Sequence, residues 1–227
     1  MSGKKHFQDH HKEVLLRVRE TDHVIPAHRA AFKKGYSSAH LPFDEQLLLW
    51  DYVWKNSNEF RPKFHAYLFL EKYISKPELL SAIWKTSVSW QNDVTDWPLC
   101  DALAKINSKI LEAYPDKVYK QLVAWNKDKD QWKRRQSVVS LLYYSRTLKV
   151  HLPYEKIAAL IEPLLADKEY YVQKGVGWSL REMGNVYPKQ TLAFLTKHIK
   201  SISAIAFTIA IEKLDEDAKN KLKSVRR

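Results

Sequence analysis

The sequence has one cysteine, five glycines and no long apolar run, and each of these shortages excludes a class of protein. Cys100 has no partner for an internal disulfide, so we expect a reducing compartment. With few glycines, and no alternating Val, Ile and Thr runs between Asn-Gly or Asp-Gly turns, there is little material for a β-sheet. No run is long enough to cross a bilayer, and the N-terminal residues lack a signal-peptide core. We therefore expect a soluble, cytoplasmic protein without a membrane partner.

Metal-binding motifs are also missing. One thiol cannot form a thiolate cluster, and the nine histidines show no metal-ligand spacing. The sequence therefore predicts no metal and no other cofactor.

What the chain has in quantity is apolar residues at helical spacing. Hydrophobic residues make up 45% of the 227 positions, which is enough to bury a core. Leu, Ala, Lys and Glu recur three and four positions apart, as in amphipathic helices. We expect an all-α protein whose core contains Trp50, Trp54, Trp84, Trp90 and Trp125.

Five prolines mark a regular repeat of helix starts. They are Pro42, Pro77, Pro115, Pro153 and Pro188, separated by 35, 38, 38 and 35 residues. Proline fits the first turn of a helix because its missing N–H would have no partner there. This period is typical of stacked helical pairs. We predict a helical-repeat solenoid (α-α superhelix) over residues 41–227 as one continuous domain, after capping helices and a loop over residues 1–40.

The second helix of each pair has its own start signal. The expected N-caps are Asn58, Asp96, Asp130 and Asp167, and an aromatic residue follows each within four positions, namely Phe60, Trp97, Trp132 and Tyr171. After Asp96, Trp97 and Asp101 share one helical face because they are four residues apart. An indole beside a carboxylate is the first candidate for chemistry.

Aligning the four aromatic residues brings more charged and aromatic side chains to the same wall. Three, four or seven positions after them are Asp101, Arg135, Lys174 and Trp178. In a stacked array such positions line up along one side, where we expect a concave basic groove. A carboxylate, two cations and an indole suit a charged ligand.

Positive charge indicates the class of that ligand. The formal net charge is +12, and residues 115–150 alone contain nine Lys or Arg against three Asp. Cations neutralise backbone phosphates without reading base sequence, and interleaved tryptophans offer flat apolar platforms. Nucleic acid is therefore the expected partner.

Three sequence motifs resemble one known family. The first is Trp97-Pro98-Leu99-Cys100-Asp101, the second is Trp132-Lys133-Arg134-Arg135, and the third and most specific is Val172-Gln173-Lys174-Gly175-Val176-Gly177-Trp178-Ser179-Leu180-Arg181-Glu182. Over roughly residues 41–214 the chain resembles the DNA alkylation repair family, the AlkD-like HEAT-repeat DNA glycosylases. The first motif looks like the Trp-x-x-x-Asp catalytic pair of that family.

The resemblance implies an activity and assigns residues to it. Asp101 would be the catalytic carboxylate, Trp97 and Trp178 would contact the lesion nucleotide, and Arg135 would hold the DNA backbone. Further DNA-binding candidates are Lys174, Arg134, Lys133 and Arg181. The implied enzyme excises cationic N3- and N7-alkylpurines from duplex DNA in base excision repair, without flipping the base. We expect a cofactor-free monomer, nucleoid-associated in a bacterial-type cytoplasm.

These assignments have structural alternatives. Asp101 could act only on its helix dipole, and Trp97 and Trp178 could be core residues. Arg135 could lie on a solvated basic face, with Arg134 as the exposed arginine instead. Two other candidates, Lys174 and Arg181, could form ion pairs with Glu169 or Glu182.

The chain also departs from the family pattern in two places. Residues 202–207 are apolar where the family has a Ser-Arg pattern, and Asp93 and Asp96 compete with Asp101 as the carboxylate. We prefer Asp101 because Trp97 precedes it at the right spacing. The alternative function is a noncatalytic helical-repeat module that binds nucleic acid or an acidic protein; a third is an RNA-binding repeat protein, which would prefer single strands.

Overall fold

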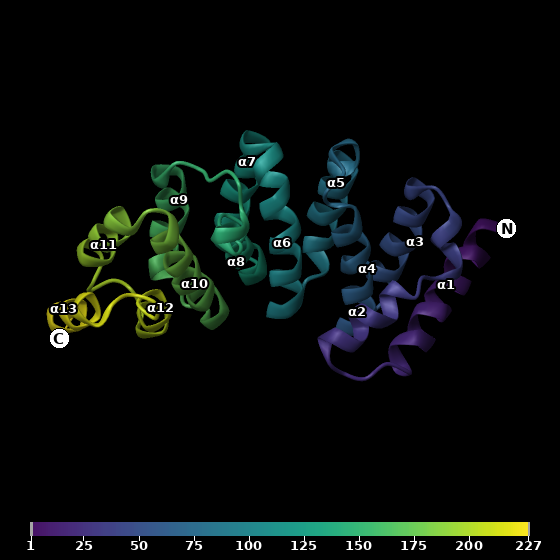
Figure 1. Ribbon diagram of the computed structural model, residues 1–227, viewed down its shortest axis with the longest axis horizontal. Coiled ribbons are helices and arrows are strands. Elements are labelled where there is room, and N and C mark those ends of the chain that lie inside the picture. Colours follow the sequence, from purple (N-terminus) through teal and green to yellow (C-terminus); the bar gives the residue numbers. More distant parts are fainter. Residues whose placement is uncertain (1, 227) are drawn as a thin grey trace. The chain divides into compact units, whose positions relative to one another are not determined.

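The computed structural model describes residues 2–226, with side chains from residue 5 onward (Figure 1). Within residues 2–226 it has 13 α-helices, short 3₁₀ turns and no strand, so the predicted all-α fold is confirmed. No helix in this range is long and apolar enough to cross a membrane. The chain divides into two compact units, Met1–Val94 and Thr95–Arg227, which are described separately below.

The first unit contains five α-helices. They are α1 (Ser2–Arg19), α2 (Ile25–Lys33), α3 (Phe43–Lys55), α4 (Phe60–Tyr73) and α5 (Leu80–Trp90), with 3₁₀ turns η1 (Ser37–His40), η2 (Pro77–Leu79) and η3 (Gln91–Asp93). Helix α1 packs against α3 and α4, and α2 packs against α4. Residues 2–40 therefore share a unit with α3, α4 and α5. The division into a cap over 1–40 and a repeat domain over 41–227 stays a prediction, as does the groove along the whole array.

Buried tryptophans form much of this unit's core. The rings of Trp54 and Trp90 stack with centroids 4.5 Å apart, and each indole N–H has an acceptor: Trp90 O for Trp54 (3.2 Å) and Asp51 Oδ1 for Trp90 (2.9 Å). Indoles are buried at low cost only when the N–H is satisfied in this way. All five tryptophans expected in the core, including Trp125 of the second unit, are at most 5% exposed, so that prediction is confirmed.

The second unit contains eight α-helices. They are α6 (Trp97–Ala113), α7 (Pro115–Asn126), α8 (Gln131–Val139), α9 (Tyr154–Ile161), α10 (Tyr170–Val186), α11 (Pro188–Lys197), α12 (Ala204–Ala210) and α13 (Glu216–Arg226), with 3₁₀ turns η4 (Ser145–Thr147) and η5 (Glu162–Ala166).

The five prolines of the repeat, which occur in both units, start helices as predicted. Pro42 and Pro153 immediately precede α3 and α9, and Pro77, Pro115 and Pro188 are the first residues of η2, α7 and α11.

Two of the four predicted N-caps are confirmed. Asp96 Oδ1 accepts from Leu99 N (2.9 Å) at the start of α6, and Asp130 Oδ1 accepts from Trp132 N (2.8 Å) at the start of α8. The assignments of Asn58 and Asp167 are wrong, because α4 begins after Glu59 and α10 after Glu169. Asp167 instead pairs through Oδ2 with Arg134 of α8, and its Oδ1 accepts from Glu169 N (2.9 Å), just before the helix begins.

Helix α10 is central to the second unit because it packs against both α8 and α12 (Figure 1). Two glycines allow this close approach. A Cβ at Gly175 would lie 3.2 Å from Arg135 Cγ, and one at Gly177 would lie 2.6 Å from Ala206 O. The helix can therefore present a row of larger side chains from its remaining surface while its small residues face α8 and α12.

Candidate active site

A pocket of about 270 Å³ in the second unit contains six of the eight predicted site residues. Its walls are Trp97 and Asp101 from α6, Arg135 from α8, Tyr171, Lys174, Trp178 and Arg181 from α10, and Ile209 and Glu212 from α12 and the turn after it. The aligned second helices thus bring together side chains that are far apart in the sequence. Asp93 and Asp96, the two competing carboxylates, do not line this pocket.

The carboxylate of Asp101 is held through one of its oxygens. Arg135 Nη2 and Nε donate to Asp101 Oδ1 at 2.8 and 3.2 Å, so neither bond uses Oδ2. The remaining guanidinium nitrogen, Nη1, donates to the carbonyl oxygen of Tyr171 on α10 (2.7 Å). Arg135 is buried, with a side chain only 7% exposed, so the alternative of a solvated basic face does not describe it. Its guanidinium links α6, α8 and α10 at the pocket floor.

Burial and charge act in opposite directions on Asp101. Burial raises the pKa of its carboxyl above the ordinary value, while the charge and hydrogen bonds of Arg135, and then the charge of Lys174, lower it. Burial prevails, and the pKa stays raised. The pocket therefore contains a carboxylate whose ionisation depends on its arginine partner.

The two predicted site tryptophans differ from the core tryptophans. Trp97 begins α6 and is 49% exposed, and Trp178 is half-buried in α10. The ring of Trp178 contacts Tyr143 at a centroid distance of 5.6 Å, and Tyr144 meets it edge-on at 6.2 Å. Both indoles thus have surface at the pocket beside Asp101.

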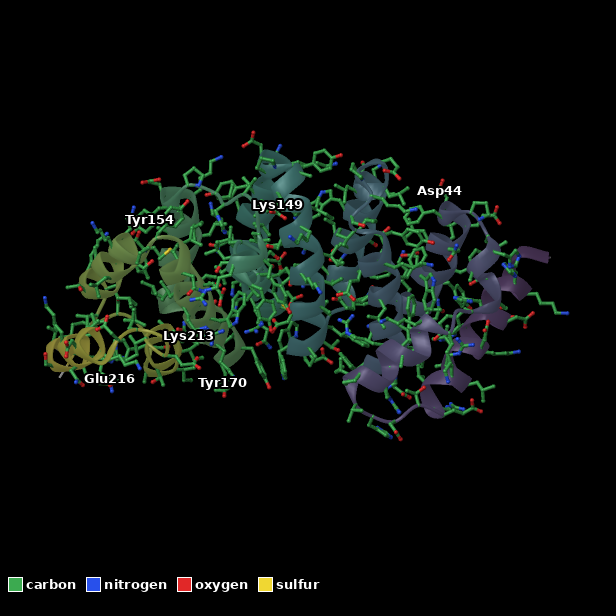
Figure 2. All side chains as sticks on the ribbon, viewed as in Figure 1. Asp44, Lys149, Tyr154, Tyr170, Lys213 and Glu216 are labelled. Carbon is green, nitrogen blue, oxygen red and sulfur yellow. The ribbon has the colours of Figure 1, made fainter. Side chains whose placement is uncertain are left out.

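Lys174 and Arg181 add positive charge to the pocket wall from α10. Lys174 lies one turn before Trp178, and its Nζ is 5.5 Å from the ring centre of Tyr170. Tyr170 is the first residue of α10 (Figure 2). Arg181 Nη1 pairs with Glu212 Oε2 at 2.7 Å, and its Nε lies 3.7 Å from Glu182 Oε1. The expected alternative of an Arg181–Glu182 pair is therefore present. Among residues 2–226 Lys174 forms no ion pair with Glu169 or Glu182.

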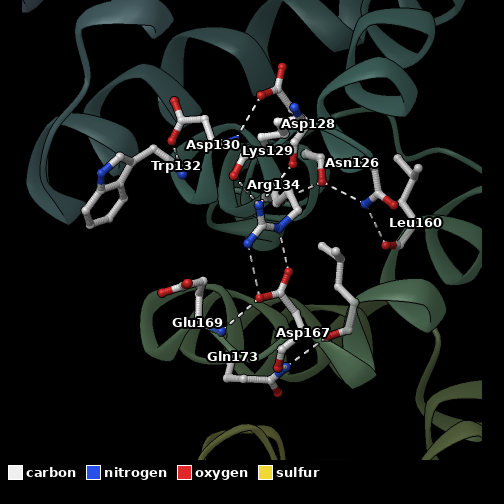
Figure 3. A network of polar contacts seen from close by, with 12 residues as sticks. Asn126, Asp128, Lys129, Asp130, Trp132, Arg134, Leu160, Asp167, Glu169 and Gln173 are labelled. Carbon is white, nitrogen blue, oxygen red and sulfur yellow. Dashed lines mark hydrogen bonds and ion pairs between the residues drawn. The ribbon is translucent and has the colours of Figure 1, made fainter.

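Arg134 and Lys133 are not brought to the pocket. Arg134 Nε lies 2.5 Å from Asp167 Oδ2, and its Nη1 donates to the carbonyl oxygens of Asp128 (2.9 Å) and Lys129 (2.7 Å), as Figure 3 shows. Lys133 pairs with Asp128 at 3.4 Å. Successive helical residues point about 100° apart, so only Arg135 of this trio faces the pocket.

Glu212 is a pocket residue that the sequence did not indicate. It follows α12 and lies outside all three motifs, and it reaches the pocket because α12 packs on α10. This packing also explains the apolar residues 202–207. Ala206 and Phe207 are buried in the α12 interface, and Ser203 caps the helix by accepting from Ala206 N (3.1 Å).

Within residues 2–226, no group of three or more His, Cys, Asp or Glu side chains is placed to hold a metal ion. The pocket instead offers carboxylates, cations and indoles. These groups can contact a sugar, a phosphate and a cationic base.

The fold of this chain is similar to that of several solved structures. Similar solved structures include a predicted DNA alkylation repair enzyme from Enterococcus faecalis (TM-score 0.68, 15% identity, 85% of this chain and 87% of that one). They also include AlkD2 (TM-score 0.62, 18%, 93% and 99%) and smu.31 (TM-score 0.54, 16%, 98% and 96%), both from Streptococcus mutans. These define the class as an all-helical repeat protein of the AlkD type.

The family follows from the sequence itself. Residues 4–214 match the family model described as DNA alkylation repair enzyme, so this chain belongs to that family. The resemblance drawn from the three motifs is thereby confirmed. A search of the curated proteins finds no match.

Proposed function

We propose that this protein is a DNA glycosylase that releases cationic N3- and N7-alkylpurines, such as 3-methyladenine and 7-methylguanine, from duplex DNA. One observation carries the proposal: Asp101, Trp97 and Trp178 line the same pocket, and the carboxylate is held at Oδ1 by Arg135. Membership of the DNA alkylation repair family supports it.

The reaction needs little more than these groups. A purine alkylated at N3 or N7 carries positive charge, so it leaves without being protonated. Breaking its glycosidic bond gives the sugar oxocarbenium character, which a fixed carboxylate stabilises electrostatically. In this proposal Asp101 Oδ2, which receives neither Arg135 hydrogen bond, faces the sugar and orients the attacking water. The indoles of Trp97 and Trp178 attract the cationic nucleotide through their faces.

Arg135 has a different role in this proposal from the one that the family resemblance implies. Its guanidinium nitrogens are bonded to Asp101 and to the Tyr171 carbonyl, so we assign it to holding the catalytic carboxylate. Contacts to backbone phosphates fall first to Lys174 on the pocket wall. Arg181 lines the same wall but is paired with Glu212 and Glu182, so it is the second candidate. Arg134 and Lys133 are left with a structural role because their charges are paired within the fold.

The family resemblance implies that the lesion is excised without being flipped out of the duplex. We therefore propose that the lesion stays within the duplex, in a monomeric enzyme that needs no cofactor and acts in a bacterial-type cytoplasm.

The decisive experiment is a time course of 3-methyladenine and 7-methylguanine release from methylated duplex DNA. We expect release well above the spontaneous rate. Asp101→Asn should lower the rate by about 10²–10³, the loss typical of one preorganised electrostatic contact, while duplex affinity is kept. Asp116→Asn is the matched control, because it removes the same charge from a highly exposed residue of the second unit.

The alternative functions give different results in the same experiment. A noncatalytic module would bind duplex DNA but release no base above the spontaneous rate. An RNA-binding repeat protein would bind single-stranded RNA more tightly than duplex DNA. Either outcome would replace the glycosylase proposal.

A further inference from the structure

Tyr144 has an unusual backbone conformation beside the pocket. Its φ of 48° and ψ of 64° place it in the left-handed region, and it is the one non-glycine residue with positive φ among those the structure describes. A bulky L-residue is unfavourable there, and such strain persists only where surrounding contacts enforce it. The conformation therefore needs an explanation beyond chain connectivity.

Hydrogen bonds within the turn and to α10 enforce this conformation. The carbonyl oxygen of Tyr144 accepts from Thr147 N (2.8 Å) and from Thr147 Oγ1 (2.9 Å). The next residue, Ser145, donates from N (2.9 Å) and from Oγ (2.8 Å) to one carboxylate oxygen of Glu182. Glu182 is buried and lies on α10 one turn after Trp178. The turn is thus fixed to the same helix that supplies the pocket wall.

Core packing does not account for the tyrosine at this position. Its residue surface is 57% exposed, and its ring only meets Trp178 and Tyr143 edge-on, at centroid distances of 6.2 and 4.8 Å. A residue retained for packing would be buried. This one extends the aromatic surface of the pocket outward from Trp178.

A cation lies two residues further along the same turn. Arg146 is exposed, and its Nη2 donates to Asn185 Oδ1 at 3.2 Å. Asn185 is two turns after Trp178 on α10, which is about 10 Å along the helix axis at 1.5 Å per residue. Consecutive nucleotides of one B-form strand rise about 3.4 Å. A strand that runs from the pocket along α10 would therefore bring a phosphate to Arg146 about three nucleotides from the lesion sugar.

We infer that the turn Tyr144–Arg146 is a second DNA contact, in which the Tyr144 ring packs on a deoxyribose flanking the lesion nucleotide and Arg146 binds a phosphate. The contact reads no base sequence, because a sugar and a phosphate are the same at every step. The inference rests on the proposed function only in taking duplex DNA as the ligand; it does not require base release. The left-handed backbone aims the ring and fixes it before binding.

Tyr144→Asn is the central variant, because asparagine tolerates the left-handed region and removes the ring. We expect its affinity for an undamaged duplex, measured by fluorescence anisotropy, to fall about fivefold, the loss found at the low end for an aromatic ring stacked on a base. Its Tm should be unchanged or higher, because strain is relieved. Tyr144→Phe should match the wild type in both measurements. Tyr114→Asn is the matched control at another exposed tyrosine of this unit.

Arg146 is tested through salt dependence. Arg146→Ala should reduce the slope of log affinity against log salt concentration by about 1, as expected for one lost phosphate contact. Lys156→Ala should leave the slope unchanged, because this exposed lysine is paired with Asp116 at 3.3 Å.

Two results would overturn the inference: wild-type duplex affinity in Tyr144→Asn, or a marked fall in the Tm of both Tyr144→Asn and Tyr144→Gly, which would make the ring a packing element. The outcomes separate from those of the glycosylase proposal. Weaker duplex binding by Tyr144→Asn in a protein that releases no methylated base would remove the proposed activity and leave this contact standing. If the wild type releases methylated base and Tyr144→Asn binds duplex DNA as tightly as the wild type, the glycosylase proposal stands and the Tyr144 contact is ruled out.

Discussion

Arg135 donates two hydrogen bonds to the same oxygen of Asp101, from Nη2 at 2.8 Å and from Nε at 3.2 Å. This geometry fixes the carboxylate while leaving Oδ2 out of both bonds. It also places the main stabiliser of the Asp101 negative charge on a neighbouring helix, so the ionisation of the candidate catalytic group depends on the packing of α6 against α8. The first prediction follows from this dependence.

Replacing Arg135 should change the pH dependence of base release. Burial already raises the pKa of Asp101, and Arg135 is the principal group that lowers it. The active form is the carboxylate, so the rate falls as the pH falls through this pKa. Arg135→Gln removes the opposing charge and should move the acidic limb of the single-turnover rate profile to higher pH. Arg135→Lys, which keeps a charge, should move it less.

An unmoved acidic limb in Arg135→Gln, with only a lower rate or weaker DNA binding, would contradict this role. Arg135 would then act on the DNA and not through Asp101. Circular dichroism of both variants checks that the buried site still folds.

Arg134 should matter for stability far more than Lys133. Arg134 and Asp167 form a largely buried pair, and Arg134 also satisfies two carbonyl oxygens (Figure 3). Removing one member of a buried pair leaves an uncompensated charge, so Arg134→Ala should lower the free energy of unfolding in urea by about 3 kcal/mol. Lys133→Ala, which breaks a more exposed pair with Asp128, should cost about 0–1 kcal/mol. Equal losses in the two variants would contradict this distinction.

The parts of the site that sequence could predict are those set by local rules. The Asp96 cap and a four-residue spacing are enough to place Trp97 and Asp101 on one face of α6. The repeat register then places Arg135, Lys174 and Trp178 at the same wall. The prediction needed only helical geometry and the stacking of similar units.

What sequence could not predict depends on contacts between helices. Arg134 and Arg135 are neighbours in one basic motif, and only the packing of α8 decides which one faces the pocket. Asp167, which was predicted to cap α10, forms the ion pair with Arg134 instead, and the helix begins after Glu169. Glu212 reaches the pocket through the packing of α12, and no residue pattern marks the left-handed turn at Tyr144.

Replacing either of two glycines of α10 with alanine should change the stability of the protein, in opposite directions. At Gly177 a Cβ would lie 2.6 Å from the carbonyl oxygen and 2.8 Å from the Cα of Ala206, so α12 would have to move. Gly177→Ala should therefore destabilise the protein by about 1–3 kcal/mol, as overpacking does. At Gly184 the nearest atom is Thr191 Cγ2 at 3.8 Å, an ordinary contact. Gly184→Ala should stabilise by up to about 1 kcal/mol through helix propensity.

Urea unfolding of the two alanine variants checks this prediction, with Gly184→Ala as the control for the change in residue type. If Gly177→Ala were as stable as the wild type, the close approach of α10 and α12 would not be needed for folding.

The first unit should lose stability as the pH falls below neutrality. His10 and His65 are buried, and burial lowers the pKa of His10 to about 4 and that of His65 to about 3. His65 Nε2 lies 3.0 Å from His28 Nδ1, and its Nδ1 bonds to the Tyr36 hydroxyl, so the neutral ring is part of a buried network. In the unfolded chain both histidines titrate near 6.5. The unfolded state therefore binds protons first as the pH drops.

The sign and window of the effect follow from these pKa values. Above about pH 6.5 both states are neutral at these residues, so they contribute no pH dependence. Below it, each histidine should reduce the free energy of unfolding by about 1.4 kcal/mol per pH unit until its folded-state pKa is reached. Urea unfolding at pH 7.5, 6.5, 5.5 and 5.0 measures the slope before most carboxylates titrate. His10→Gln should reduce this slope by the contribution of one histidine, about 1.4 kcal/mol per pH unit. A wild-type slope of zero over the same range would mean that these rings are charged or solvated in the folded protein.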